Sequence, residues 1–163
     1  MRGSVIPTKN ILFAGIGGQG TILASEITCQ VLMESQYDVK KSEVHGMSQR
    51  GGSVKSDIRF GSKVYSPIIP DGETDIFVAF HDSELERNLI FLKPDGIVIR
   101  IEDSDKQFIP HAKVSNLFLI GKLSCHLPVE TKKWEDVIKQ MVPPAFLDQN
   151  LTAFRNGVKR GHA

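Results

Sequence analysis

Two glycine-rich segments in the first third of the chain carry the residue types best suited to binding chemistry. The first, Gly15-Ile16-Gly17-Gly18-Gln19-Gly20, follows an apolar run and opens a segment with helical spacing. In that context glycines let the backbone present its amides to an anion at the start of a helix. The second, His45-Gly46-Met47-Ser48-Gln49-Arg50-Gly51-Gly52, places an imidazole, polar side chains and a guanidinium on a flexible backbone. Both segments are therefore candidate binding loops.

The side chains of the second segment suggest recognition of an anion or of a partner. A guanidinium between glycines suits a carboxylate, a phosphate or a partner's carbonyl groups, and a merely solvated arginine is the alternative. We take His45 and Arg50 as the candidate catalytic residues. The candidate anion-binding or interface residues are Gly15, Gly17, Gly18, Gln19, Gly20, Ser48, Gln49 and Gly51.

The first segment also fits the fingerprint of dinucleotide-binding folds. Gly15, Gly17 and Gly20 have the spacing, and Glu43 lies roughly where the ribose-binding acid is expected. A tight strand-to-helix turn with no ligand explains the same glycines equally well. The side-chain amide of Gln19, at the start of the helix, is suited to a ligand oxygen or to a partner's backbone.

Several other kinds of chemistry lack their sequence pattern. The five histidines form no HxH or HExxH pair and the two cysteines form no CxxC, so we expect neither zinc nor an iron–sulfur cluster in this chain. No Gly-x-Ser-x-Gly elbow supports serine catalysis. His81-Asp82-Ser83 follows an apolar run, where ligands gather, but a serine or aspartate helix cap is the favoured interpretation.

Length, charge and composition predict a soluble, single-domain, cytoplasmic protein. The 163 residues carry a formal net charge of +1, which argues against nucleic acid or a membrane surface as the main partner. No apolar run approaches the roughly 20 residues needed to cross a bilayer, and the N-terminus lacks the apolar core of a signal peptide. Cys29 and Cys125 are expected to be reduced and buried.

The hydrophobic pattern alternates between strands and helices and predicts a three-layer α/β/α sandwich with a mainly parallel sheet. Gly61-Ser62-Lys63 is predicted to turn a hairpin into residues 64–66, and residues 102–110 to form a loop or a short edge strand. Gly121 is small enough to let another backbone approach. Strands are expected at 11–14, 37–42, 53–60, 74–80 and 97–101, and helices at 21–34, 83–91, 115–127, 131–141 and 147–158.

The chain resembles a known family over most of its length. Residues 11–20 and 41–54 look like the gamma subunit or domain of the 2-oxoacid:ferredoxin oxidoreductases, most of all the small beta subunit of the indolepyruvate enzymes. Residues 114–123 and 142–154 are similar to later blocks of that family. The block from His45 to Val54 is the most specific part. Between Ile101 and Lys113 the sequence is shorter than the family pattern, in which a further helix and strand are expected.

The resemblance implies a Rossmann-like gamma domain over residues 1–163 that serves as a subunit of an enzyme. The family decarboxylates 2-oxoacids oxidatively with coenzyme A. A large partner would bear the thiamine diphosphate, magnesium and iron–sulfur clusters and pass electrons to ferredoxin. The isolated chain would be inactive, and the glycine-rich loops would close over the partner's active site. An arylpyruvate such as indolepyruvate is the substrate implied. A pyruvate- or 2-oxoglutarate-type gamma subunit, an independent NAD(P)-binding oxidoreductase and a purely structural subunit remain alternatives.

Overall fold

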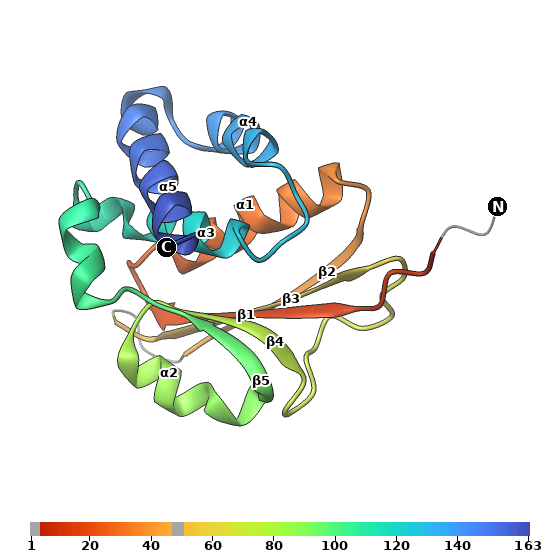
Figure 1. The fold of residues 1–163 in the computed structure, drawn as a ribbon. Coiled ribbons are helices and arrows are strands. Elements are labelled where there is room, and N and C mark those ends of the chain that lie inside the picture. The colour runs from red at the N-terminus through yellow and green to blue at the C-terminus, as the bar shows by residue number, and fades with distance from the viewer. Residues whose placement is uncertain (1–3, 47–50) are drawn as a thin grey trace.

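A five-stranded sheet forms the centre of the fold (Figure 1). The computed structural model describes residues 4–46 and 51–163. The strand order is β2-β3-β1-β4-β5. Strand β3 runs antiparallel to both of its neighbours, while β1, β4 and β5 are parallel. The strands are β1 (Lys9–Ile16), β2 (Asp38–His45), β3 (Ser53–Gly61), β4 (Thr74–Ala79) and β5 (Leu92–Ile99).

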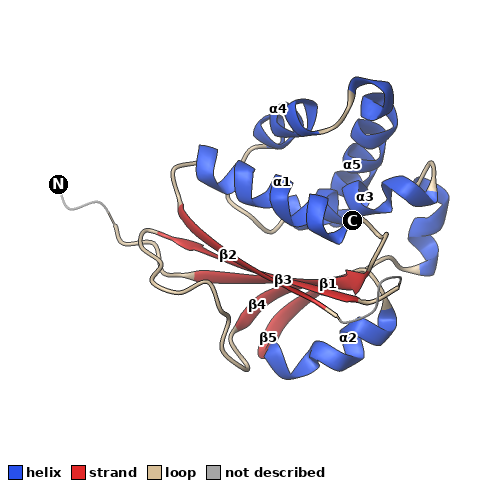
Figure 2. Cartoon of the chain, turned by 180° about the vertical axis from the view of Figure 1, so that it is seen from behind, coloured by secondary structure: helices blue, strands red, loops and turns tan. Residues whose placement is uncertain are grey.

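The two faces of this sheet are covered unequally. Most of the α-helices of the described residues lie on one face, and a short helix lies on the other, as Figure 2 shows from behind. This arrangement confirms the predicted α/β class with helices on both sides of a mostly parallel sheet. The helices are α1 (Thr21–Glu34), α3 (Ser115–Ser124), α4 (Thr131–Met141) and α5 (Leu147–Gly161) on the first face and α2 (Asp82–Asn88) on the second.

The apolar runs of β1 and β4 are continuous because both strands are buried on both faces. Ile11 and Phe13 of β1 belong to the large core beneath α1 and α3, whereas Leu12 and Ala14 belong to a small core on the α2 side. The α2 side is completed by Ile69 from the loop after β3. On this face, α2 and the loop after β3 take the place of the full layer of helices expected in a three-layer sandwich.

The predicted hairpin from Gly61 into residues 64–66 is wrong. Strand β3 already pairs with β1 on one side and β2 on the other, so no ladder is open to a third partner. Side-chain carboxylates hold this segment instead: Asp38 Oδ2 accepts from the Val64 amide at 2.8 Å, and Asp57 Oδ2 accepts from the Ile69 amide at 3.1 Å. Asp38 and Asp57 therefore hold the loop after β3 against the sheet.

Strand β5 is an edge strand that begins earlier than its sequence suggests. The pairing with β4 shifts between Thr74 and Ile76, whose partners are Leu92 and Ile97. Pro94 falls within this irregular stretch, where a missing backbone donor is tolerated at a sheet edge. The turn pattern at residues 93–96 thus marks a bulge inside a strand.

Helices α3 and α5 cross closely because both carry glycine at the contact. A Cβ on Gly121 would overlap the Phe154 carbonyl oxygen, and one on Gly157 would overlap the carbonyl oxygen of Phe118. The prediction that Gly121 admits another backbone is confirmed. The crossing brings Phe118 and Phe154 into the core with no exposed surface.

The two cysteines are both free thiols, as predicted. Each is partly buried, so the prediction of buried thiols holds only in part. Burial is the main cause of a rise in the pKa of Cys29 to about 11. Burial raises the pKa of the Cys125 thiol as well. Neither thiol is disposed to ionise near neutral pH.

Residues 102–110 form a 3₁₀ helix (Asp103–Phe108) rather than an edge strand, and a buried carboxylate anchors it. Asp105, only 1% exposed, accepts from Lys122 Nζ and Arg160 Nε, each at 2.9 Å. Burial alone would raise the pKa of Asp105. The Glu102 amide, Lys122 and Arg160 outweigh it, and the pKa lies below its ordinary value. Asp105 thereby ties this segment to α3 and α5.

We expect Asp105→Asn to destabilise the fold at neutral pH by about 2–3 kcal/mol, because it leaves Lys122 without its anionic partner in a largely buried place. The native carboxyl has a lowered pKa, so its contribution is complete above the unfolded-state pKa of about 3.9 and is lost as the pH falls through the native value. Urea unfolding at pH 7 and at pH 3 checks this. The gap between parent and variant should shrink at pH 3, and an equal gap at both pH values would contradict the assignment.

Candidate functional site

The first glycine-rich loop joins the end of β1 to α1 at the carboxyl edge of the parallel strands. Gly18 and Gly20 adopt left-handed φ angles of 93° and 77°. Gly20 is the N-cap of α1, and within residues 4–46 and 51–163 no side chain caps this helix. The first-turn amides of α1 consequently lack intrahelical partners at this edge. A hollow of about 360 Å³ lies here, lined by Ile16, Gly17, Gly18, Gly20, Thr21, Ile22 and Val54.

The second glycine-rich segment returns to the chain beside the first. The Gly17 amide donates to the Gly52 carbonyl oxygen at 2.9 Å, and the Gly46 amide donates to that of Ser53 at 2.6 Å. Gly51 is exposed. The fold thus ties together two segments about 25 residues apart. Ser48, Gln49 and Arg50 lie outside the described residues, so the roles predicted for them stay predictions.

His45 ends β2 at this same edge and is oriented by Glu43. Its Nε2 lies 2.9 Å from Glu43 Oε1, and Glu43 Oε2 lies 2.6 Å from Lys41 Nζ. The hydrogen bond from Lys41 is the main cause of a lowered pKa at Glu43, and the one from His45 adds to it. The His45 ring is exposed and therefore accessible from the loop side.

These contacts argue against the dinucleotide interpretation of Glu43. In a dinucleotide-binding fold, the ribose-binding acid follows the strand next to β1. Here β3 lies between β1 and β2, so Glu43 is two strands away from the glycine-rich loop. Its carboxylate is also engaged by Lys41 and His45.

Gln19 forms two hydrogen bonds within the chain, and the ligand or partner role predicted for its amide stays a prediction. Its Oε1 accepts from the Ile16 amide at 2.8 Å, and its Nε2 donates to the Phe80 carbonyl oxygen at 3.0 Å. Both ends of the side chain are used within the chain. Gln19 thereby joins the ends of β1 and β4 and so holds the first loop in place.

Asn116 of α3 reaches the start of α1, although no sequence pattern marked it as functional. Its Nδ2 donates to the Gly20 carbonyl oxygen at 3.3 Å. Among the described residues, neither Asn116 Oδ1 nor the buried Thr21 Oγ1 has a hydrogen-bond partner. An unsatisfied buried polar atom costs about 1–3 kcal/mol. Two such atoms beside an uncapped helix start indicate a place for a polar ligand.

A larger hollow lies on the other side of Asn116. Its volume is about 470 Å³, and both apolar and hydrogen-bonding side chains face it. The two hollows together flank the start of α1. The lining of the larger one comes from Leu23, His111, Lys113, Val114, Asn116, Val142, Pro143, Phe146, Gln149 and Asn150.

A helix begins at residues 81–83 as expected, but the predicted serine or aspartate cap is wrong, because a histidine provides it. His81 Nδ1 accepts from the Ser83 amide at 3.2 Å and is therefore the N-cap of α2. The Ser83 hydroxyl lies 2.8 Å from the same nitrogen. His81 thus serves the helix rather than a ligand.

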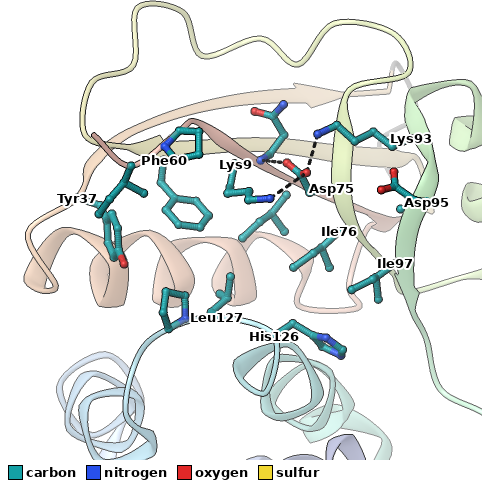
Figure 3. A pocket seen from close by; sticks show the side chains of 16 residues that line it. Lys9, Tyr37, Phe60, Asp75, Ile76, Lys93, Asp95, Ile97, His126 and Leu127 are labelled. Atoms are coloured by element: carbon teal, nitrogen blue, oxygen red, sulfur yellow. Dashed lines mark hydrogen bonds and ion pairs between the residues drawn. The ribbon is translucent and has the colours of Figure 1, made fainter. Parts of the chain in front are cut away.

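A separate cavity of about 330 Å³ opens at the opposite edge of the sheet, where β1 and β4 begin (Figure 3). Lys9 Nζ and Lys93 Nζ lie 3.6 and 2.7 Å from Asp75 Oδ1, over an apolar floor that includes Ile76 and Ile97. The hydrogen bond with Asp75 raises the pKa of Lys93. The predicted site residues are not among those that line this cavity.

The glycines of the first loop should differ in their tolerance of a side chain. Gly20→Ala combines left-handed strain of about 1–2 kcal/mol with overlap on the Asn116 amide. Gly18→Ala meets the strain alone, and Gly17→Ala meets only ordinary contacts, with the Gly52 carbonyl oxygen 3.7 Å away. Thermal unfolding should rank the losses Gly20, then Gly18, then Gly17. Equal midpoints for all three variants would contradict this geometry.

Across residues 4–46 and 51–163, the structure contains no group of three or more His, Cys, Asp or Glu side chains placed to hold a metal ion. None of the helices in these ranges is long and apolar enough to cross a membrane. The side chains present therefore give a metal or cluster no evident place in the described part of the chain.

Comparison with known proteins identifies the family. Residues 10–114 match the family model of pyruvate ferredoxin/flavodoxin oxidoreductase. The chain is 31% identical over 190 positions to the indolepyruvate oxidoreductase subunit IorB of Thermococcus kodakarensis, covering 92% of this chain and 94% of the relative. The chain therefore belongs to the pyruvate ferredoxin/flavodoxin oxidoreductase family. The resemblance inferred from the two glycine-rich segments is confirmed.

Solved structures share this fold. The gamma subunit of a keto/oxoacid ferredoxin oxidoreductase from Geobacter sulfurreducens superposes with a TM-score of 0.77 at 24% identity, covering 94% of this chain and 98% of that one. A 2-oxoglutarate:ferredoxin oxidoreductase from Magnetococcus marinus, solved with 2-oxoglutarate, coenzyme A and succinyl-CoA bound, gives a TM-score of 0.82 at 18% identity. It covers 95% of this chain but 31% of that one. The fold thus occurs both as a separate chain and inside a longer one.

The alignment with the Thermococcus relative also shows a difference in length. It extends over 190 positions, yet only 92% of this chain, about 150 of its 163 residues, takes part. About 40 positions of the relative therefore have no counterpart here. The expected shortening between Ile101 and Lys113 stays a prediction, because the alignment length gives no position for the difference.

Proposed function

We propose that this chain is a subunit, itself without cofactors, of a 2-oxoacid:ferredoxin oxidoreductase. In the complete enzyme, a 2-oxoacid and coenzyme A would give an acyl-CoA and carbon dioxide, with two electrons passed to ferredoxin. A large partner subunit would hold the thiamine diphosphate, magnesium and iron–sulfur clusters. Family membership and the absence of a metal-binding group in the described residues both favour this division of labour.

The observation that carries the proposal is the pair of joined glycine-rich segments at the carboxyl edge of the sheet. They meet through the bond between the Gly17 amide and the Gly52 carbonyl oxygen, and Gly17, Gly18 and Gly51 are exposed. Loops that are exposed yet fixed at their bases are suited to closing over a partner's active site and excluding water there.

This edge also suits an anion. The uncapped start of α1 offers backbone amides and the positive end of the helix dipole. The Thr21 hydroxyl, which lacks a partner among the described residues, adds a hydrogen-bond donor at this edge. The substrate carboxylate and the phosphates of coenzyme A are both anions. We propose that the first loop helps to hold one of them and that Arg50 supplies a cationic fork.

We further propose an arylpyruvate, such as indolepyruvate, as the substrate. This choice follows the name of the Thermococcus relative, which is an indolepyruvate oxidoreductase subunit. A pyruvate- or 2-oxoglutarate-type gamma subunit is the alternative. Steady-state rates of the assembled enzyme with indolepyruvate, pyruvate and 2-oxoglutarate would distinguish these substrates, and a preference for either of the last two would contradict the choice.

The proposal treats residues 1–163 as a single gamma-type domain that works in the cytoplasm as part of a hetero-oligomer. Co-purification of the tagged chain from its native cells tests the assembly. We expect a large, brown partner that releases thiamine diphosphate on denaturation. Recovery of the chain with no such partner would contradict the proposal.

An independent NAD(P)-dependent oxidoreductase is the main competing function. The spacing of the glycines permits it, but β3 separates β1 from β2 and Glu43 is engaged by Lys41 and His45. Titration of the isolated chain with NAD⁺ and NADP⁺ discriminates between the two. Saturable binding at micromolar concentrations would favour the competing function.

A further inference from the structure

The second glycine-rich segment is fastened at its C-terminal base by a buried carboxylate from the opposite side of the sheet. Glu84, in the first turn of α2, is only 3% exposed. Its Oε2 accepts a hydrogen bond from the Ser53 hydroxyl, and its Oε1 lies 3.2 Å from Arg87 Nη1. Arg87 Nη1 also donates to the Ser53 hydroxyl oxygen at 3.2 Å. Ser53, Glu84 and Arg87 thus form a closed three-membered cluster.

Ser53 is the residue at which this segment enters β3. Its carbonyl oxygen accepts from the Gly46 amide, and the neighbouring Gly52 carbonyl oxygen accepts from the Gly17 amide. The Ser53 side chain therefore sits between the two backbone bonds that close the second segment and join it to the first. A group that fixes this side chain therefore also holds the backbone of Gly52 and Ser53 in place for both bonds.

A buried carboxylate is costly unless it is paired and hydrogen-bonded. The Glu84 backbone is fixed as well, because its carbonyl oxygen accepts from Asn88 Nδ2 at 2.8 Å, and Leu85 beside it packs against the small core. Glu84 therefore presents a rigidly placed charge to Ser53. Within α2 this charge lies in the first turn and pairs with Arg87, and its bond to Ser53 is the contact that reaches the second segment.

We propose that Glu84 is a positioning residue that holds the base of the Gly46–Gly52 segment against the first glycine-rich loop. The inference rests on the proposed function, in which these segments act at the partner's active site. Glu84 acts through Ser53 and contacts neither substrate nor cofactor. Losing it would loosen the segment without unfolding the domain.

Amide hydrogen exchange in the full chain tests the clamp itself. In Glu84→Gln and in Ser53→Ala, the Gly17 and Gly46 amides should exchange about tenfold faster, as expected for loss of a charge-assisted hydrogen bond. The Phe77 and Val78 amides in β4 serve as internal references and should not change. Glu86→Gln, an exposed acid on the same helix, and Ser53→Thr, which keeps the hydroxyl, should match the parent. Unchanged exchange at Gly17 and Gly46 in both Glu84→Gln and Ser53→Ala would overturn the clamp.

Kinetics of the assembled complex test its connection to the reaction. In Glu84→Gln, the factor by which the apparent KM for the 2-oxoacid or coenzyme A rises should be about three times the factor by which kcat falls, or more. Ser53→Thr should keep the parental kinetic constants. Parental kinetics despite faster exchange would overturn the positioning role. Arg50→Ala, assayed in parallel, separates failure of this inference from failure of the proposed function. An impaired Arg50→Ala with a parental Glu84→Gln refutes only this inference, whereas two parental variants also refute the active-site role of the loops.

Discussion

Replacing Arg50 by alanine should lower turnover, or raise an apparent Michaelis constant, of the assembled enzyme by about tenfold or more. A charged hydrogen bond is worth about 1.5–3 kcal/mol, and its loss in the transition state converts to a factor of this size. Arg50→Lys keeps the charge but loses the planar fork, so it should also be clearly impaired if recognition is bidentate. Steady-state kinetics with both 2-oxoacid and coenzyme A provide the measurement.

The control for this prediction is complete assembly, because a docking defect would mimic a catalytic one. Each variant complex should be checked for full stoichiometry before assay. His45→Gln is a useful companion and should be milder if His45, whose ring lies beside Glu43, only orders the loop. An Arg50→Ala complex that assembles and turns over like the parent would favour the purely structural subunit.

Gly157→Ala should produce one of the largest losses of stability available in this fold. The new Cβ would overlap the Phe118 carbonyl oxygen and lie 3.1 Å from the Gly121 Cα, so α3 and α5 must move apart. Overpacking of this kind costs about 1–3 kcal/mol, and more where rigid backbone is struck. We expect about 3 kcal/mol, which lowers the melting temperature of a chain of this length by roughly 6–12 °C.

Thr152→Ala is the matched control on the same helix. Thr152 is exposed on α5, and alanine has the higher helix propensity, so this variant should unfold at or slightly above the parental temperature. Thermal unfolding by circular dichroism provides the comparison. A Gly157→Ala midpoint within about 2 °C of the parent would show that the close crossing of α3 and α5 contributes little.

The sequence predicted the elements whose patterns arise from burial. Residues 11–14 and 76–79 are continuous apolar runs because β1 and β4 are covered on both faces. Helix α4 was predicted at its observed bounds because Trp134, Val137 and Ile138 all face the core. In such segments the local spacing of apolar residues reports directly on the environment.

The elements that failed depend on contacts remote in sequence. The predicted hairpin at Gly61 looked plausible locally, but β3 already had β1 and β2 as partners. Residues 103–108 form a 3₁₀ helix because Asp105 reaches Lys122 and Arg160, which no local pattern could show. Strand order is likewise set by tertiary packing.

The features of the candidate site were likewise predicted only where they depend on local sequence. The glycine spacing correctly predicted a turn at the start of α1, whereas the hydrogen bond that joins this turn to the second segment is visible only in the folded chain. The hydrogen bond from Gln19 to Phe80 was not foreseen, because Phe80 lies 61 residues away in the sequence. Asn116 and Glu84 escaped notice because each acts on a loop to which it is close only in the folded chain.

Reconstitution of 2-oxoacid oxidation tests the central claim most directly. The purified chain, the purified thiamine-binding partner and their equimolar mixture would each be assayed for indolepyruvate- and coenzyme A-dependent reduction of ferredoxin. We predict no activity for the colourless chain alone, little for the partner alone and full turnover for the mixture. Turnover by this chain free of partner, or full turnover by the partner without it, would contradict the account.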